Sequence, residues 1–153
     1  MQDSEFILPD FNEPDVKVDK ILFMVDTSGS MSEEQITDCF SEIQGAINQF
    51  DSHLRGQIGF FDTEIKAIYD FDQYTDLSEI LPTGGGGTDF NCIFYYLNRL
   101  YKDEDKPKTV VILTDGYAPE IITHPRYDFQ LLWLINNNVS TPKYGEIIRI
   151  VTI

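Results

Sequence analysis

Five oxygen-bearing side chains stand in three separate short segments whose residue types suit the binding of one metal ion. The first segment, residues 26–30 (DTSGS), follows a continuous apolar run; the second, residues 87–89 (GTD), follows a run of glycines; the third, residues 114–116 (TDG), follows another apolar run. Mg²⁺ and Mn²⁺ prefer carboxylate, hydroxyl and water oxygens, and no sulfur or imidazole is present here to favour zinc. The candidate metal ligands are Asp26, Ser28, Ser30, Thr88 and Asp115.

The segments that precede the two aspartates are typical of central strands. Residues 21–25 (ILFMV) and 108–114 (KTVVILT) are apolar on both faces, which indicates parallel strands covered on both sides. Ligand sites in such sheets lie outside the carboxyl ends of the strands. If the two strands are neighbours, their ends lie about 4.8 Å apart, and Asp26 faces Asp115. In an extended segment Asp26, Ser28 and Ser30 would point the same way, and the flexible glycines would let the Thr88 loop approach.

The remaining pattern predicts a three-layer α/β domain. Ser32 and Gln35 form a capping box ahead of an amphipathic helix of about 17 residues. Strand-like runs at 57–61 and 65–71 are joined so closely that they must form an antiparallel hairpin. A weak helix follows at 76–81, a second helix starts at 88–89, and further strands are expected at 130–135 and 147–153. We therefore expect a Rossmann-like fold, with a mostly parallel sheet, an antiparallel edge hairpin, helices on both faces and a shortened C-terminal part.

The segments DTSGSM, GGTDF and LTDG, in this order, resemble the metal-ion-dependent adhesion site (MIDAS) of von Willebrand factor A (VWA) domains. That pattern is Asp-x-Ser-x-Ser, then a distant Thr, then a distant Asp, and all its positions are present here. The resemblance implies a VWA-like domain over residues 20–153. Residues 1–19 are acidic, contain two prolines and show little periodicity, so we expect them to form a linker or N-terminal arm. The tail, LLWLI followed by Tyr-Gly and IIRI, resembles a compact bacterial VWA-like family in which the domain follows a metallopeptidase-type domain in a longer protein.

The resemblance implies a protein-binding module without catalytic residues of its own. A metal held mainly by neutral hydroxyls stays electrophilic, so an Asp or Glu of a partner protein can fill its open position. Bacterial relatives often work with AAA+ ATPases, which makes such an ATPase the expected kind of partner. VWA domains that switch affinity move a last helix for which this sequence has no room, so we expect no piston-like switching.

Other interpretations stay open from the sequence. A bound ion could act as a Lewis acid in a phosphoester hydrolase, but the motifs hold no histidine, no nucleophile–base pair and no second carboxylate cluster. The domain could also be a scaffold whose metal is purely structural. Residues 26–30 alone would fit a turn that caps the next helix, and it is Thr88 and Asp115 that favour the metal site.

Composition narrows the partners further. The chain has 153 residues, 42% of them apolar, and a net charge of −15, so it suits one globular domain and is a poor partner for nucleic acid or anionic membranes. It has no signal peptide and no apolar run near the ~20 residues of a membrane span, so we expect a cytoplasmic protein. Cys39 and Cys92 are expected to be reduced core residues, Asp89 a helix cap and Trp133 a core residue.

Overall fold

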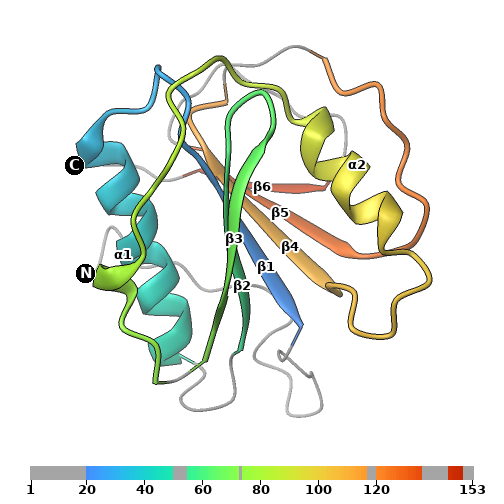
Figure 1. Ribbon diagram of the computed structural model, residues 1–153, viewed down its shortest axis with the longest axis horizontal. Coiled ribbons are helices and arrows are strands. Elements are labelled where there is room, and N and C mark those ends of the chain that lie inside the picture. Colours follow the sequence, from blue (N-terminus) through green and yellow to red (C-terminus); the bar gives the residue numbers. More distant parts are fainter. Residues whose placement is uncertain (1–19, 50–54, 73, 117–119, 136–144, 150–153) are drawn as a thin grey trace.

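The computed structural model describes residues 20–49, 55–72, 74–116, 120–135 and 145–149. These residues form a six-stranded sheet with the order β3-β2-β1-β4-β5-β6 and helices on both faces (Figure 1). The strands are β1 (Ile21–Asp26), β2 (Gly56–Phe61), β3 (Ile65–Phe71), β4 (Thr109–Thr114), β5 (Gln130–Ile135) and β6 (Glu146–Arg149). Neighbouring strands are parallel except β2 and β3, which are antiparallel. The predicted mostly parallel sheet with an antiparallel edge hairpin is confirmed.

Helix α1 (Glu33–Gln49) covers one face of the sheet, and α2 (Asn91–Arg99) covers the other. The capping box that predicted α1 is present: the backbone N–H of Ser32 donates to Gln35 Oε1 at 2.8 Å, and that of Gln35 donates to Ser32 Oγ at 3.1 Å. Before α2, the Asp89 carboxylate accepts the backbone N–H of Asn91, the first residue of the helix, at 2.9 Å. The residue at the N-cap position itself is Phe90, which makes no side-chain capping bond. The weak helix predicted at 76–81 is one 3₁₀ turn, η2 (Leu77–Glu79).

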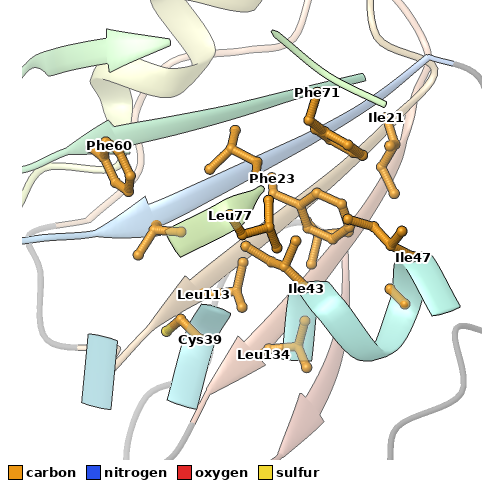
Figure 2. Packing of buried hydrophobic residues seen from close by; sticks show 14 of the residues in the cluster. Ile21, Phe23, Cys39, Ile43, Ile47, Phe60, Phe71, Leu77, Leu113 and Leu134 are labelled. Atoms are coloured by element: carbon orange, nitrogen blue, oxygen red, sulfur yellow. The ribbon is translucent and has the colours of Figure 1, made fainter. Parts of the chain in front are cut away.

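The apolar strands fill two core layers because successive side chains point to opposite faces of the sheet. From β1, Ile21, Phe23 and Val25 pack towards α1, whereas Leu22 and Met24 pack towards α2. Figure 2 shows the α1 layer, in which Leu77 of η2 lies beside Phe23. Trp133 and Cys39 are buried, Cys92 is half-buried, and both cysteines are free, as predicted. The continuous apolar character of β1, β4 and β5 is thus explained by cover on both faces.

The C-terminal part was predicted to be short of helices, and the structure describes residues 120–135 and 145–149 of it. Strand β4 returns to β5 through residues 120–129, which contain no helix. The predicted arm at 1–19, the connection at 136–144 and the last part of the predicted final strand, residues 150–153, lie outside the described residues. Within the described part of the chain, no helix is long and apolar enough to cross a membrane.

Candidate metal site

Parallel pairing of β1 with β4 places the first and third segments side by side. Val25 is opposite Leu113 in the register, so the next residues, Asp26 and Thr114, meet at the carboxyl ends of the two strands. Thr114 Oγ1 donates a hydrogen bond of 2.6 Å to Asp26 Oδ2 and accepts the backbone N–H of Gly116 at 3.0 Å. Asp26, Thr114 and the following Asp115 are each at least 97% buried. The strand ends that the sequence predicted to be neighbours are neighbours.

The chain after β1 turns sharply instead of continuing as an extended segment. The backbone N–H of Ser28 donates to Asp26 Oδ1 at 2.8 Å, and that of Met31 donates to the carbonyl oxygen of Ser28 at 3.0 Å. The expectation that alternation along an extended strand would align the side chains was wrong, because the Asp26 carboxylate folds the backbone into a turn. The turn still gathers hydroxyls, since Ser28 Oγ and Ser30 Oγ are 3.1 Å apart.

The glycine run packs its backbone directly against this turn. The N–H of Gly29 donates to the carbonyl oxygen of Gly86 at 2.8 Å, and Thr27 Oγ1 donates to that of Thr83 at 2.6 Å. A Cβ on Gly84 would lie 2.1 Å from Thr27 Oγ1, so no larger residue fits there. The run therefore brings the half-buried Thr88, a few residues later, to the same edge of the sheet as Asp26.

A third buried aspartate, which sequence reasoning treated only as part of a hairpin connection, binds the glycine run. Asp62 is 3% exposed, and its carboxylate accepts the backbone N–H groups of Glu64 and Gly86, each at 3.1 Å. Its own carbonyl oxygen accepts the N–H of Asp89 at 2.9 Å. Burial alone would raise the pKa of Asp62, but these hydrogen bonds and the nearby charge of Lys66 lower it. Asp62 thus binds the backbone both before Thr88, at Gly86, and after it, at Asp89.

A buried amide joins the start of α2 to the chain that follows Asp115. Asn91 Oδ1 accepts hydrogen bonds from the backbone N–H groups of Ile122 and Thr123 and from Thr123 Oγ1, at 2.8–2.9 Å. Its Nδ2 donates to the carbonyl oxygen of Glu120 at 3.1 Å. Asn91 therefore holds residues 120–123 against the helix that begins just after Thr88. This role could not be predicted from the sequence, because an Asn in the first turn of a helix is common.

The electrostatics of the site favour a cation. Burial raises the pKa of Asp26, the negative charge of Asp115 raises it further, and hydrogen bonds from Ser28 and Thr114 oppose the rise. A nearby cation would stabilise the ionised form of both carboxylates. In the part of the chain that the structure describes, no group of three or more His, Cys, Asp and Glu side chains is arranged to hold a metal. A metal at this edge would therefore need hydroxyl ligands as well.

The donor set fits a hard cation such as Mg²⁺ or Mn²⁺. Asp26 and Asp115 supply buried carboxylates, and the clustered hydroxyls of Ser28 and Ser30 supply neutral oxygens. Both oxygens of Asp26 already accept a protein hydrogen bond, which leaves each with a lone pair for a metal-bound water or an ion. Ser30 is exposed and Thr88 is half-buried, so the donors extend from the sheet to the surface. All five predicted residues therefore lie on the three segments that meet here.

The fold defines a Rossmann-like α/β domain, with a candidate metal site at the carboxyl ends of β1 and β4. The chain belongs to the family described as VWA-like domain (DUF2201), whose model matches residues 21–151. No match was found among curated proteins.

A solved structure shares this architecture. The chain is similar to the crystal structure of the ArnB paralog VWA2 from Sulfolobus acidocaldarius, with a TM-score of 0.58 and 18% sequence identity. The similarity covers 80% of this chain and 36% of that one, so this chain spans little more than a third of its length. At this identity the likeness shows the fold.

Proposed function

We propose that this chain is a divalent-metal-dependent protein-binding module. Mg²⁺ or Mn²⁺ would be held by Asp26, Ser28, Ser30, Thr88 and Asp115, and would recognise an Asp or Glu side chain of a partner. VWA-like domains commonly mediate protein interactions and are generally not catalytic, which supports a binding role. The metal and the acidic partner residue are the parts of the proposal that experiment must establish.

One observation carries the proposal: three segments far apart in the sequence meet through direct hydrogen bonds at one edge of the sheet. Thr114 bonds to Asp26, and the turn that begins at Asp26 bonds to the glycine run that leads to Thr88. A turn that only capped α1 would not need the other two segments. Their convergence around two buried carboxylates supports a ligand site.

In the proposed function, Asp26 would hold the ion and the exposed side of the site would admit the partner. Asp26 is held in place by Thr114 and by the turn, so its negative charge faces a fixed point. A bound ion would supply a positive charge with a coordination position left open to a partner's carboxylate. Because Ser30 is exposed, an outside group can reach this edge of the site. As the partner we propose an AAA+ ATPase, on the support of the sequence resemblance alone.

Unfolding experiments test the metal site directly. An ion that binds only the folded chain should raise the free energy of unfolding by about 2.7 kcal/mol when its free concentration is 100 times Kd. We expect Mg²⁺ or Mn²⁺ to stabilise the wild type relative to EDTA, and Asp115→Ala to abolish the effect. Glu104→Ala removes an equal charge from an exposed residue and should leave the effect intact. Equal stability in metal and in EDTA would refute the site.

A pull-down from the source cell tests the binding function. Proteins retained by the wild type in Mg²⁺ should be lost in EDTA and with Asp115→Ala, and retained by Glu104→Ala. Identification of an AAA+ ATPase among them by mass spectrometry would support that partner, and its absence would refute it. A metal that stabilises the fold while no protein depends on it would support the scaffold alternative.

A further inference from the structure

A groove with an apolar floor lies between α1 and the segment that contains η2. Its volume is about 730 Å³, and it follows α1 from Glu33 to Gln44, which is about 17 Å of helix. In Figure 1 the segment from η2 to the glycine run passes alongside α1. The apolar residues of the groove are Ile36, Phe40, Leu77, Ile80, Leu81 and Pro82.

The floor of the groove packs against the core of the domain, and its upper edge is exposed. Phe40 packs its ring against Phe60 of β2 at a centroid distance of 5.9 Å, and Leu77 is buried in the α1 core layer (Figure 2). Leu81, in contrast, is a large apolar side chain that is 71% exposed. A large apolar side chain exposed beside a preformed apolar groove is typical of a protein-interaction site.

Both walls of the groove are free of positive charge. No Lys or Arg occurs between Lys20 and Arg55, or between Lys66 and Arg99, and the groove is built only from these two stretches. Among the residues that line it, Glu33 is the only one with a charged side chain. Further exposed acidic residues belong to the same two elements without lining the groove: Glu34 and Asp38 on α1, and Asp76 and Glu79 at η2. The potential here favours a positively charged occupant. It disfavours a second copy of this chain, whose net charge is also −15.

One end of the groove is close along the chain to residues of the candidate metal site. On the helix side, Glu33 lies three residues after Ser30. On the other side, Pro82 is followed by Thr83, whose carbonyl oxygen accepts the hydrogen bond from Thr27 Oγ1. A bound segment that leaves the groove past these residues therefore reaches the hydroxyls of the first segment.

We infer that this groove binds an extended segment of the partner protein, with apolar side chains against the floor and Lys or Arg residues facing Glu33 and the exposed acidic residues near the groove. About five extended residues span the 17 Å of groove. The acidic residue that would bind the metal follows at the end next to Ser30. The inference rests on the proposed metal site for that acidic residue, and on the groove alone for the apolar and basic ones.

Selection from a random library of displayed 12-residue peptides, carried out on the full chain in Mg²⁺, tests the inference. We expect the selected peptides to combine several apolar residues with Lys or Arg and one Asp or Glu. In ¹⁵N NMR titrations with a synthetic copy of a selected peptide, the backbone amide signals of residues 36–44 and 77–81 should shift. Peptides that are uniformly acidic, shifts confined to other faces, or no enrichment at all would overturn it.

Two surface variants separate the groove from the metal. Leu81→Lys and Thr37→Lys place positive charge on exposed groove residues and should each weaken the selected peptide about tenfold or more. Tyr95→Lys changes an apolar residue of α2 that is 59% exposed, and it should leave affinity unchanged. Circular dichroism of each variant confirms that it is folded.

The outcomes distinguish failure of the groove from failure of the metal site. If EDTA and Asp115→Ala weaken the peptide while both groove variants bind normally, the metal-dependent function stands and the groove inference is overturned. If the groove variants weaken it while EDTA has no effect, the groove is supported and the metal-dependent function fails. Sedimentation that shows dimers of the wild type but monomers of Leu81→Lys would assign the groove to self-association and overturn the inference.

Discussion

Replacement of Thr114 by Val tests whether the buried hydrogen bond between β4 and β1 organises the site. The substitution keeps the branched shape of the side chain and replaces its hydroxyl group by a methyl group. That hydroxyl donates to Asp26 Oδ2 at 2.6 Å and accepts the N–H of Gly116 at 3.0 Å, and Thr114 is 2% exposed. Water therefore cannot easily replace either bond in the variant.

The expected loss follows from these two bonds. A hydrogen bond to a charged group contributes roughly 1.5–3 kcal/mol, and an acceptor withdrawn from a buried N–H costs roughly 1–3 kcal/mol. The added methyl group is buried and offsets about 0.8 kcal/mol of this. We expect Thr114→Val to lower the free energy of unfolding by about 3 kcal/mol.

Urea unfolding in EDTA, at pH 7, measures the change without a contribution from metal. Thr109→Val, at the half-buried opposite end of the same strand, is the control and should change stability by less than about 0.5 kcal/mol. In an Asp26→Asn background the acceptor is neutral, so Thr114→Val should cost about 1 kcal/mol less than in the wild type. A loss below about 0.5 kcal/mol, or an equal loss in both backgrounds, would refute the reasoning.

Two further predictions concern a glycine and a buried acid. Gly84→Ala should destabilise the chain by about 2 kcal/mol or more and weaken stabilisation by metal, because its Cβ would lie 2.1 Å from Thr27 Oγ1. Gly45→Ala, a control on α1 with open space around the new Cβ, should stabilise the chain by up to about 1 kcal/mol in the same unfolding assay. A larger loss of stability for Gly45→Ala than for Gly84→Ala would contradict the packing. Glu42 on α1 is 7% exposed, and burial together with the charge of Asp38 raises its pKa to about 7. The stability that this raised pKa contributes is complete below the ordinary value of 4.5 and is lost as pH rises through 7. Glu42→Gln should therefore stabilise the chain at pH 8 by on the order of 1 kcal/mol and have little effect at pH 4. A stabilisation by Glu42→Gln that does not increase between pH 4 and pH 8 would contradict this.

The elements that follow from local sequence were predictable. The continuous apolar runs gave β1 and β4 because only strands covered on both sides have that composition, and Ser32 with Gln35 gave the start of α1. The weak helix near residue 77 is only a 3₁₀ turn, since Ile80 is extended and Pro82 follows closely. Its apolar residues are explained by burial of Leu77 against the sheet, which no periodicity within the segment could indicate.

The approach of the strand ends in the candidate site was predictable, but the residues that hold the surrounding segments in place were not. Adjacency of β1 and β4 could be expected from their shared character, and it brings Asp26 to Thr114. The role of Asp62 depends on a bond to Gly86 across 24 residues, and that of Asn91 on a bond to Thr123 across 32. Neither has a local pattern, because ordinary turns and helix starts use the same residue types. The turn after Asp26 was considered only as an alternative to an extended segment. The sequence could not decide between the two, because a carboxylate can bond to the backbone two residues ahead in many loops.

The long sequence separations in the site have a consequence for the order of folding. The bond from Thr114 to Asp26 joins residues 88 apart, and that from Thr27 to Thr83 joins residues 56 apart. Contacts of this span are costly in loop-closure entropy and wait for the strands on either side to pair. We therefore expect this edge of the sheet to form late in folding, after most of the core is buried. A ligand bound there would slow unfolding and leave the rate of folding nearly unchanged, so it would lengthen the lifetime of the native domain without hastening its formation.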